Sequence, residues 1–477
     1  MSDESDSDPA SGLDLKSVTK NFATDRATNS IKIRRSMLGH LSKYGTDSDV
    51  SSPSSQEDQL AVIANIAQTK FSPEIIQSNF ESGNADLTQF TCDLALFMKM
   101  HPDVSIITDP EQVELIVNAL GYFTDSVGIS NFLYLIIILS SKFDNEIVDS
   151  GFFFMVRDET FQNFPMEVLE FYQTISLESK YCHNAILCTG ILYDIVQLYQ
   201  STSEEKIIIQ AAKTFETIMS ISTNEDADSI RDLIPDIVNM LSNPCAEAVT
   251  NILHAIVDLL RISTSFITLF FGAKLHEIIA QLMPMPQLSK PCLDILGSMC
   301  VCSDKQFPLL FPLVEIACQL IGGDFTGDVY WTLMNALDSC PIMILPFIDN
   351  NFMTNTAQIL NNSAYSVMRE VACFVATLLV VAPIAELKNI LSHNIILPII
   401  DMLDCGEPPL ILRCLDGLKK VVMAAYNDTS IIDSTPDLFQ SDELEEALER
   451  LHEIEDPRIN SRAMQLISDL ETLKKSN

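Results

Sequence analysis

The sequence predicts an all-α protein built from short helices that are stacked as repeats along the chain. From residue 58 to residue 474, apolar residues recur with helical spacing, at positions i, i+3, i+4 and i+7. This pattern itself recurs about every 40 residues. Strand and helix patterns do not alternate as they would in a βαβ fold. With 47% hydrophobic residues and 15 glycines, most of this range can pack into a core.

The repeat length follows from a series of apolar stripes. The stripes begin at Val113, Leu192, Ile234, Leu275, Leu313 and Ile396, with a weaker copy at Met353. From Leu192 onward, successive stripes start 38 to 43 residues apart, and 79 residues, or two periods, separate Val113 from Leu192. A period near 40 with two or three helices per unit is typical of armadillo and HEAT repeats, which stack because no unit can bury its apolar face alone. We therefore expect an armadillo-repeat superhelix, an α-solenoid, of about ten repeats over residues 58–474.

The first 57 residues differ in composition from the rest of the chain. Ser, Asp, Thr and Gly dominate there and hydrophobic periodicity is absent, so we expect a disordered, acidic and serine-rich tail. Its opening MSDESDSDPASG lacks the apolar core of a secretory signal. The longest uncharged apolar run, 371–385, has 15 residues and is shorter than the roughly 20 needed to cross a bilayer. The twelve cysteines form no C-x-x-C pair, which is typical of a reducing compartment.

The chain is strongly acidic. Its 29 basic and 65 acidic side chains give a net charge of −36, which repels nucleic acid and anionic membranes. Two interpretations of this charge remain open, namely attraction of a basic partner and simple solubility.

The single tryptophan, Trp331, stands one helical turn before Asn335 in the stretch VYWTLMNALDSC. In the 40-residue frame both residues fall on the last helix of their unit, the helix that lines the concave groove of an armadillo superhelix. Positions i and i+4 share one face of a helix. Trp331 could be a packing aromatic or a platform for a ligand. Asp328, one turn earlier, could supply charge for a basic side chain or cap the helix.

This W-x-x-x-N spacing resembles importin-α, the adaptor of nuclear import. In that family the asparagine amide hydrogen-bonds the backbone of an extended cargo peptide, and neighbouring indoles hold the stems of Lys and Arg. The resemblance therefore implies that Trp331, Asn335 and Asp328 bind cargo peptide. Cation–π attraction adds roughly 0.5 to 2 kcal/mol per contact.

Three further stretches resemble the same family. The stretch REVACFVATLLVVAPIAELKNILSHNIILPIIDMLD (369–404) is similar to one of its repeats, and DELEEALERLHEIEDPRINSRAMQLISDLE (442–471) to its final repeat, which contacts an export receptor. The stretch 21–43 is similar to the importin-β-binding segment, with Phe22, Arg34 and Arg35 in the matching places. The resemblance thus implies an importin-β-binding arm at about residues 20–44.

The sequence also departs from the family, whose groove sites need several Trp/Asn pairs in successive repeats. The equivalents of Trp331 are Leu133, Lys213, His254, Leu293 and Cys373, and those of Asn335 are Ile137, Thr217, Asp258, Gly297 and Thr377. A single pair survives, and the arm lacks a second basic cluster. Either the groove now recognises a different kind of ligand, or part of it no longer binds peptide.

No catalytic or metal-binding pattern is expected. The segment HEIIA begins like a zinc-protease helix, but Ala280 replaces the second histidine. Cys182, His183 and Cys188 stand at the start of a repeat helix, where core packing is the favoured interpretation.

The leading hypothesis is an importin-α-like adaptor in the cytoplasm and nucleus, without enzymatic activity, metal or cofactor. Its expected partners are basic nuclear localisation signals in the groove, importin-β at the arm and an export receptor at the final repeat, with no nucleic acid or membrane. The alternative is an armadillo interaction scaffold whose groove no longer reads nuclear signals.

Overall fold

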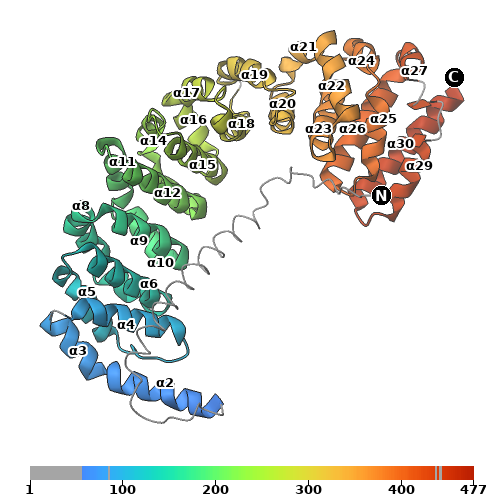
Figure 1. The fold of residues 1–477 in the computed structure, drawn as a ribbon. Coiled ribbons are helices and arrows are strands. Elements are labelled where there is room, and N and C mark those ends of the chain that lie inside the picture. The colour runs from blue at the N-terminus through green and yellow to red at the C-terminus, as the bar shows by residue number, and fades with distance from the viewer. Residues whose placement is uncertain (1–55, 84–85, 304, 436–437, 440–442, 477) are drawn as a thin grey trace, which may run out of the picture. The chain divides into compact units, whose positions relative to one another are not determined.

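The computed structural model describes residues 56–83, 86–303, 305–435, 438–439 and 443–476, and within these ranges every regular element is a helix. The chain divides into two units, Met1–Lys70 and Phe71–Asn477. In the first unit the described element is α2 (Gln56–Lys70). In the second, α3 to α30 follow one another as stacked repeats (Figure 1).

Each repeat ends in a helix that packs against the last helix of the next repeat, and we call this set the third-helix layer. Over the described residues it comprises α4 (Leu87–Met100), α6 (Ser126–Asp149), α9 (Pro165–Glu178), α12 (Glu205–Ile221), α15 (Ala246–Ile262), α18 (Pro286–Met299), α20 (Thr326–Ser339), α23 (Tyr365–Val381), α26 (Pro408–Ala425) and α30 (Pro457–Ser476). Each of them contacts the next in chain order.

Shorter helices precede each member of that layer, and we call them the first- and second-helix layer. They are α3 (Pro73–Ser82), α5 (Pro110–Asn118), η1 (Ala119–Tyr122), α7 (Phe152–Met155), η2 (Val156–Thr160), α8 (Phe161–Asn163), α10 (Lys180–Cys188), α11 (Ile191–Ser201), η3 (Asn224–Asp226), α13 (Ala227–Arg231), α14 (Ile234–Met240), α16 (Ser265–Gly272), α17 (Leu275–Leu282), η4 (Phe307–Leu310), α19 (Phe311–Cys318), η5 (Pro341–Met343), α21 (Ile344–Phe347), α22 (Asn350–Asn362), α24 (Ile384–Leu391), α25 (Ile396–Asp401), η6 (Met402–Asp404), α27 (Ser430–Ser434), α29 (Glu443–Arg450) and η7 (Leu451–Glu453).

Three helices per repeat distinguish the armadillo arrangement from a two-helix repeat. The sets α10–α11–α12, α13–α14–α15 and α16–α17–α18 show it most regularly. The predicted all-α armadillo-repeat solenoid is therefore confirmed as the fold of the second unit.

Backbone geometry explains the sharp turn between the first and second helices of a repeat. Gly190, Lys274 and Asn394 each hold a positive φ, of 81°, 63° and 55°, immediately before or close to the second helix. A left-handed residue ends a helix and redirects the chain within one position, which glycine does without a Cβ penalty. Proline at the first helical position, as at Pro286, then starts a third helix because its missing N–H would be unpaired there anyway.

The predicted apolar stripes form the core. Their first residues, from Val113 to Ile396, are each between 0% and 4% exposed. Within the described residues, α6 is the one helix that is long and apolar enough to span a membrane. Its Phe132, Leu135 and Ile136 are buried, and the helix packs against α4 and α9. Residues 131–141, which are part of α6, therefore belong to a core helix of a repeat.

Candidate functional site

Helix α20 carries all three residues that the sequence singled out for the groove. The helix buries Val329, Tyr330, Thr332, Leu333, Ala336 and Leu337 against its neighbours. Asp328, Trp331 and Asn335, spaced three and four residues apart, are half-buried instead. They therefore share the remaining face of α20, which belongs to the third-helix layer.

Trp331 rests on the backbone of the preceding repeat. A Cβ atom placed on Gly297 of α18 would lie 2.3 Å from Cζ3 and 2.9 Å from Cη2 of the Trp331 indole. Such distances are far below van der Waals contact, so the six-membered ring occupies the space that any other side chain at position 297 would take. Trp331 is thus a packing residue at its ring edge, while the side chain as a whole stays partly accessible.

The Asn335 side chain lies one turn after Trp331 on the same face of α20. This half-buried side chain takes part in no hydrogen bond with any residue in the part of the chain that the structure describes. An amide carries donors and an acceptor, so it can hydrogen-bond both groups of a peptide backbone. The Asn335 amide, one turn from the indole, is therefore available to a ligand.

Asp328 is already engaged by a base of the protein. Its carboxylate accepts a hydrogen bond from Lys290 of α18, and the Lys290 ammonium also lies 3.9 Å from Asp294. Burial works to lower the pKa of Lys290, but the hydrogen bond that it donates to Asp328 and the nearby carboxylates raise the pKa overall. The N-cap of α20 is Phe325 and has no side-chain cap bond, so capping is not the role of Asp328.

The same pairing of charges continues along the third-helix layer. His254 Nδ1 lies 3.2 Å from a Glu216 oxygen, and this hydrogen bond raises the pKa of His254. Arg413 of α26 reaches past α23 to Asp338 of α20, donating from Nη1 and Nη2 at 2.9 and 2.6 Å. On α12 to α26, several acids of this layer are therefore partly neutralised by bases of neighbouring repeats.

The other positions equivalent to Trp331 do not form a row of ligand platforms. Leu133 and Leu293 are buried, at 2% and 0% exposure. Lys213 pairs with Glu247 at 2.8 Å. The surviving pair on α20 is thus isolated, as the sequence comparison of repeats indicated.

Sequence reasoning missed two features of this site. It placed Gly297 at the Asn-equivalent position without recognising that the missing side chain makes room for Trp331. It also missed the Lys290–Asp328 pair, although the 38-residue separation, close to one repeat, was visible in the sequence. The three arm residues Phe22, Arg34 and Arg35 lie outside the described residues.

The described residues contain no group of three or more His, Cys, Asp or Glu side chains that could hold a metal ion. Cys182 and His183 lie on α10, and both are buried, at 0% and 3% exposure. Burial raises the pKa of the Cys182 thiol to about 11, so it stays protonated at neutral pH.

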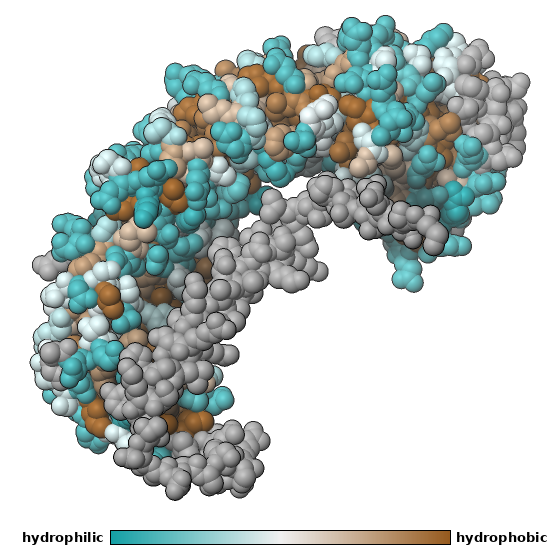
Figure 2. All heavy atoms as spheres, in the orientation of Figure 1, coloured by the Kyte–Doolittle hydropathy of each residue, from teal (hydrophilic) through white to brown (hydrophobic). Residues whose placement is uncertain are grey.

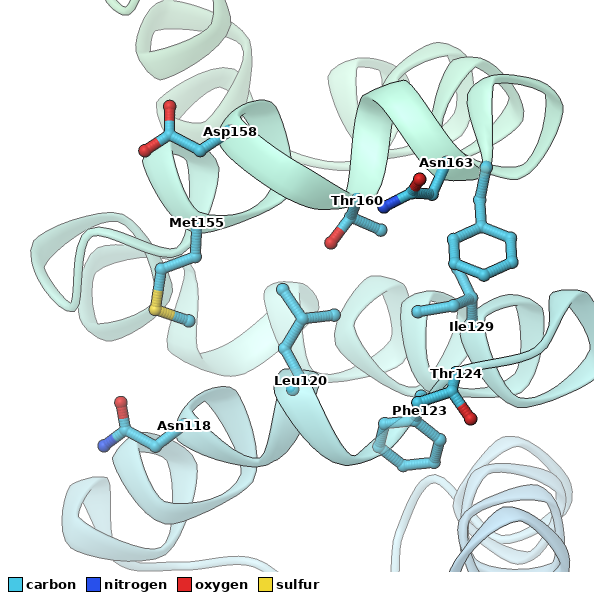
Figure 3. Close-up of a pocket in the computed structure, with 11 residues that line it drawn as sticks. Asn118, Leu120, Phe123, Thr124, Ile129, Met155, Asp158, Thr160 and Asn163 are labelled. Atoms are coloured by element: carbon cyan, nitrogen blue, oxygen red, sulfur yellow. The ribbon is translucent and has the colours of Figure 1, made fainter.

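A cleft lies between the second helices of two early repeats (Figure 3). Its volume is about 740 Å³, and one wall is the irregular helix α7–η2–α8, which contains a π turn. Asp158, Thr160 and Asn163 stand on that wall, opposite Leu120 and Asn118. Single π turns are common at functional sites, but these side chains form no recognised catalytic pattern.

No protein-family model matches the sequence, and no curated protein matches it either. Among solved structures, an engineered protein from the Northeast Structural Genomics Consortium is similar with a TM-score of 0.64 and 17% identity, over 88% of this chain and 97% of that chain. The designed armadillo repeat protein YIII(Dq)4CqI has a TM-score of 0.34 at 12% identity, over 58% of this chain and 99% of its own, which is too low to bear on the fold. The likeness to the first structure, together with the three-helix repeats, shows an armadillo-type α-solenoid.

Proposed function

We propose that this protein is an armadillo-repeat adaptor that binds an extended peptide along the third-helix layer, centred on α20. The observation that carries the proposal is the Asn335 amide, which has no hydrogen-bond partner among the described residues and lies one turn from the half-exposed Trp331 indole. An extended peptide needs an anchor for its backbone and a surface for a side chain. The two residues supply both from one rigid helix, and such pre-organisation lowers the cost of binding.

The leading form of the proposal is an importin-α-like adaptor for basic nuclear localisation signals. The Asn335 hydrogen bond would contribute about 0.5 to 1.5 kcal/mol. A Lys or Arg stem on Trp331 would add roughly 0.5 to 2 kcal/mol. In this form the segment at residues 20–44 binds importin-β, the final repeat meets an export receptor, and the protein moves between cytoplasm and nucleus.

A second candidate is an armadillo scaffold that reads a different kind of segment. The pairing of Asp328 with Lys290 and of Asp338 with Arg413 favours it, because a basic ligand must displace these cations before it gains the same attraction. A ligand with few charges meets no such competition.

Fluorescence titration decides between the two candidates. Trp331 is the single tryptophan of the chain, so its emission reports on the α20 site alone. A Lys/Arg-rich peptide and a peptide of the same length with Ser and Ala at those positions are titrated into the full chain. If the protein is the adaptor, the basic peptide should change the Trp331 emission, and Asn335→Ala should weaken the binding of that peptide. Equal responses to both peptides favour the scaffold, and no response to either contradicts both.

The importin-β arm is tested separately by deleting residues 1–57. Loss of importin-β association supports the arm, and unchanged association in a quantitative assay contradicts it. If the tail competes for the groove, the deletion instead raises affinity for the basic peptide.

A further inference from the structure

A second, apolar cleft lies on the first- and second-helix layer, away from the α20 site. It opens between α19 and the next repeat's η5, α21 and α22, and has a volume of about 460 Å³. Its lining is apolar except for one carboxylate and one thiol, and comprises Phe311, Val314, Glu315, Cys318, Ile342, Met343, Pro346, Phe347 and Phe352. Hydrophobic residues gather over α19 in the space-filling view (Figure 2).

The rim of this cleft exposes large apolar side chains to solvent. Ile342 is 75% exposed and Phe311 is 38% exposed. The floor, by contrast, is formed by buried Phe347 and Met343. Isolated apolar side chains on a surface are ordinary, but an exposed apolar rim around an apolar hollow is typical of a binding site for another chain.

The stretch of sequence that forms the cleft carries charge of one sign. Between Lys305 and Arg369 the sequence contains five acidic residues and no Lys, Arg or His. Two of the five, Asp328 and Asp338, pair with bases from other repeats on the third-helix layer.

Of the remaining acids, one lines the cleft and a second caps a helix that contributes to its wall. Glu315 is part of the wall. Asp349 caps α22 and accepts the backbone N–H of Phe352, whose ring lines the cleft. Neither forms an ion pair with any residue that the structure describes. An occupant with positive charge beside its apolar side chain would meet uncompensated carboxylates here.

We propose that this cleft binds a basic amphipathic segment of a partner protein, one that inserts large apolar side chains and places Lys or Arg beside Glu315 and Asp349. The apolar side chains cover the rim at Ile342 and Phe311. The basic residues fix the orientation and account for the absence of any base between residues 305 and 369. This site is independent of the peptide site on α20.

The test uses the full chain and a fluorescein-labelled synthetic peptide in which Leu and Lys alternate with helical spacing, followed by fluorescence anisotropy. Two matched peptides carry Ala for every Leu or Glu for every Lys. Ile342→Asp removes the apolar rim, and its side chain is exposed enough for the fold to tolerate the change. Val127→Asp, at a residue that is 64% exposed on α6, adds the same charge away from the cleft.

We expect Ile342→Asp to weaken binding of the Leu/Lys peptide by about tenfold or more, as loss of one buried apolar side chain predicts. Val127→Asp should leave the affinity unchanged or slightly higher, because it adds negative charge. The Ala and Glu peptides should both bind less tightly than the Leu/Lys peptide. A second variant, Glu315→Lys, should weaken the Leu/Lys peptide and strengthen the Glu peptide.

Three results would overturn the proposal. An equal loss of affinity in both aspartate variants, or equal binding of the Ala peptide and the Leu/Lys peptide, would mean that the peptide only adsorbs to an acidic surface. Tight binding of the Glu peptide would mean that charge does not select the occupant. A self-associated protein that Ile342→Asp converts to monomer in sedimentation would mean that a second copy of the chain covers the cleft.

Discussion

The contact between Trp331 and Gly297 predicts how the substitution Gly297→Ala changes the free energy of unfolding. Two effects of opposite sign contribute to that change. Gly297→Ala in the interior of α18 should stabilise an isolated helix by about 1 kcal/mol, since alanine has the higher helix propensity. Here the new methyl would lie 2.3 Å from Cζ3 of the indole, so the ring must move. Overpacking of this kind costs typically 1 to 3 kcal/mol. We therefore expect the free energy of unfolding to fall by up to about 2 kcal/mol, not to rise.

Urea denaturation followed by Trp331 emission measures both consequences. The displaced indole becomes more accessible to water, so its emission in the folded state should shift to longer wavelength. Gly272→Ala on α16 is the matched control, because a Cβ there meets nothing within 4 Å, and this variant should be as stable as the parent or more so. If Gly297→Ala behaves like Gly272→Ala and leaves the emission unchanged, the indole does not rest on position 297 and the reasoning fails.

The other predictions concern the same face. Trp331→Ala should weaken peptide binding about thirtyfold, in line with aromatic hot spots, and a large loss of stability with unchanged affinity would instead assign Trp331 to packing. Lys290→Ala releases Asp328 and should raise affinity for a Lys/Arg peptide up to about fivefold at low salt; equal affinity in calorimetry would mean that Asp328 takes no part. Because Glu216 raises the pKa of folded His254, this pair stabilises the fold at low pH and loses that effect as pH rises through the folded pKa. The melting-temperature difference between the parent and His254→Gln should therefore shrink from about pH 5.5 to about pH 8, and a constant difference would contradict the pair.

The fold could be predicted from the sequence because every repeat must meet the same packing requirement when the repeats stack. Each second helix must turn one apolar face inward, so the stripes at Leu192 and Leu275 carry the period directly in the sequence. First helices were harder, since η4 and α27 span only four and five residues and leave no periodic pattern. The distorted helix α7–η2–α8 was not predicted either, because a π turn depends on local packing.

The candidate site was predictable only as a set of residues on one helix face. Trp331 and Asn335 share that face by spacing alone, and the structure places them together on α20. The α18 residues that contact this face, Gly297 against Trp331 and Lys290 against Asp328, lie 34 and 38 residues earlier in the chain. Which side chains meet across repeats depends on the rotation between neighbouring third helices, which a single sequence does not specify. The Gly297 contact and the Lys290 pair therefore required the structure.

The ion pair between Arg413 and Asp338 has a consequence for how the repeats melt. Repeat proteins behave as one-dimensional chains whose units couple only to nearest neighbours, so unfolding can stop at any junction. This pair joins residues 75 positions apart and skips the repeat of α23, adding a next-nearest-neighbour coupling. The coupling is small for a half-exposed pair, at about 1 kcal/mol or less. It nevertheless acts only while the repeats of α20, α23 and α26 are all folded, and so favours the three melting together as one cooperative block.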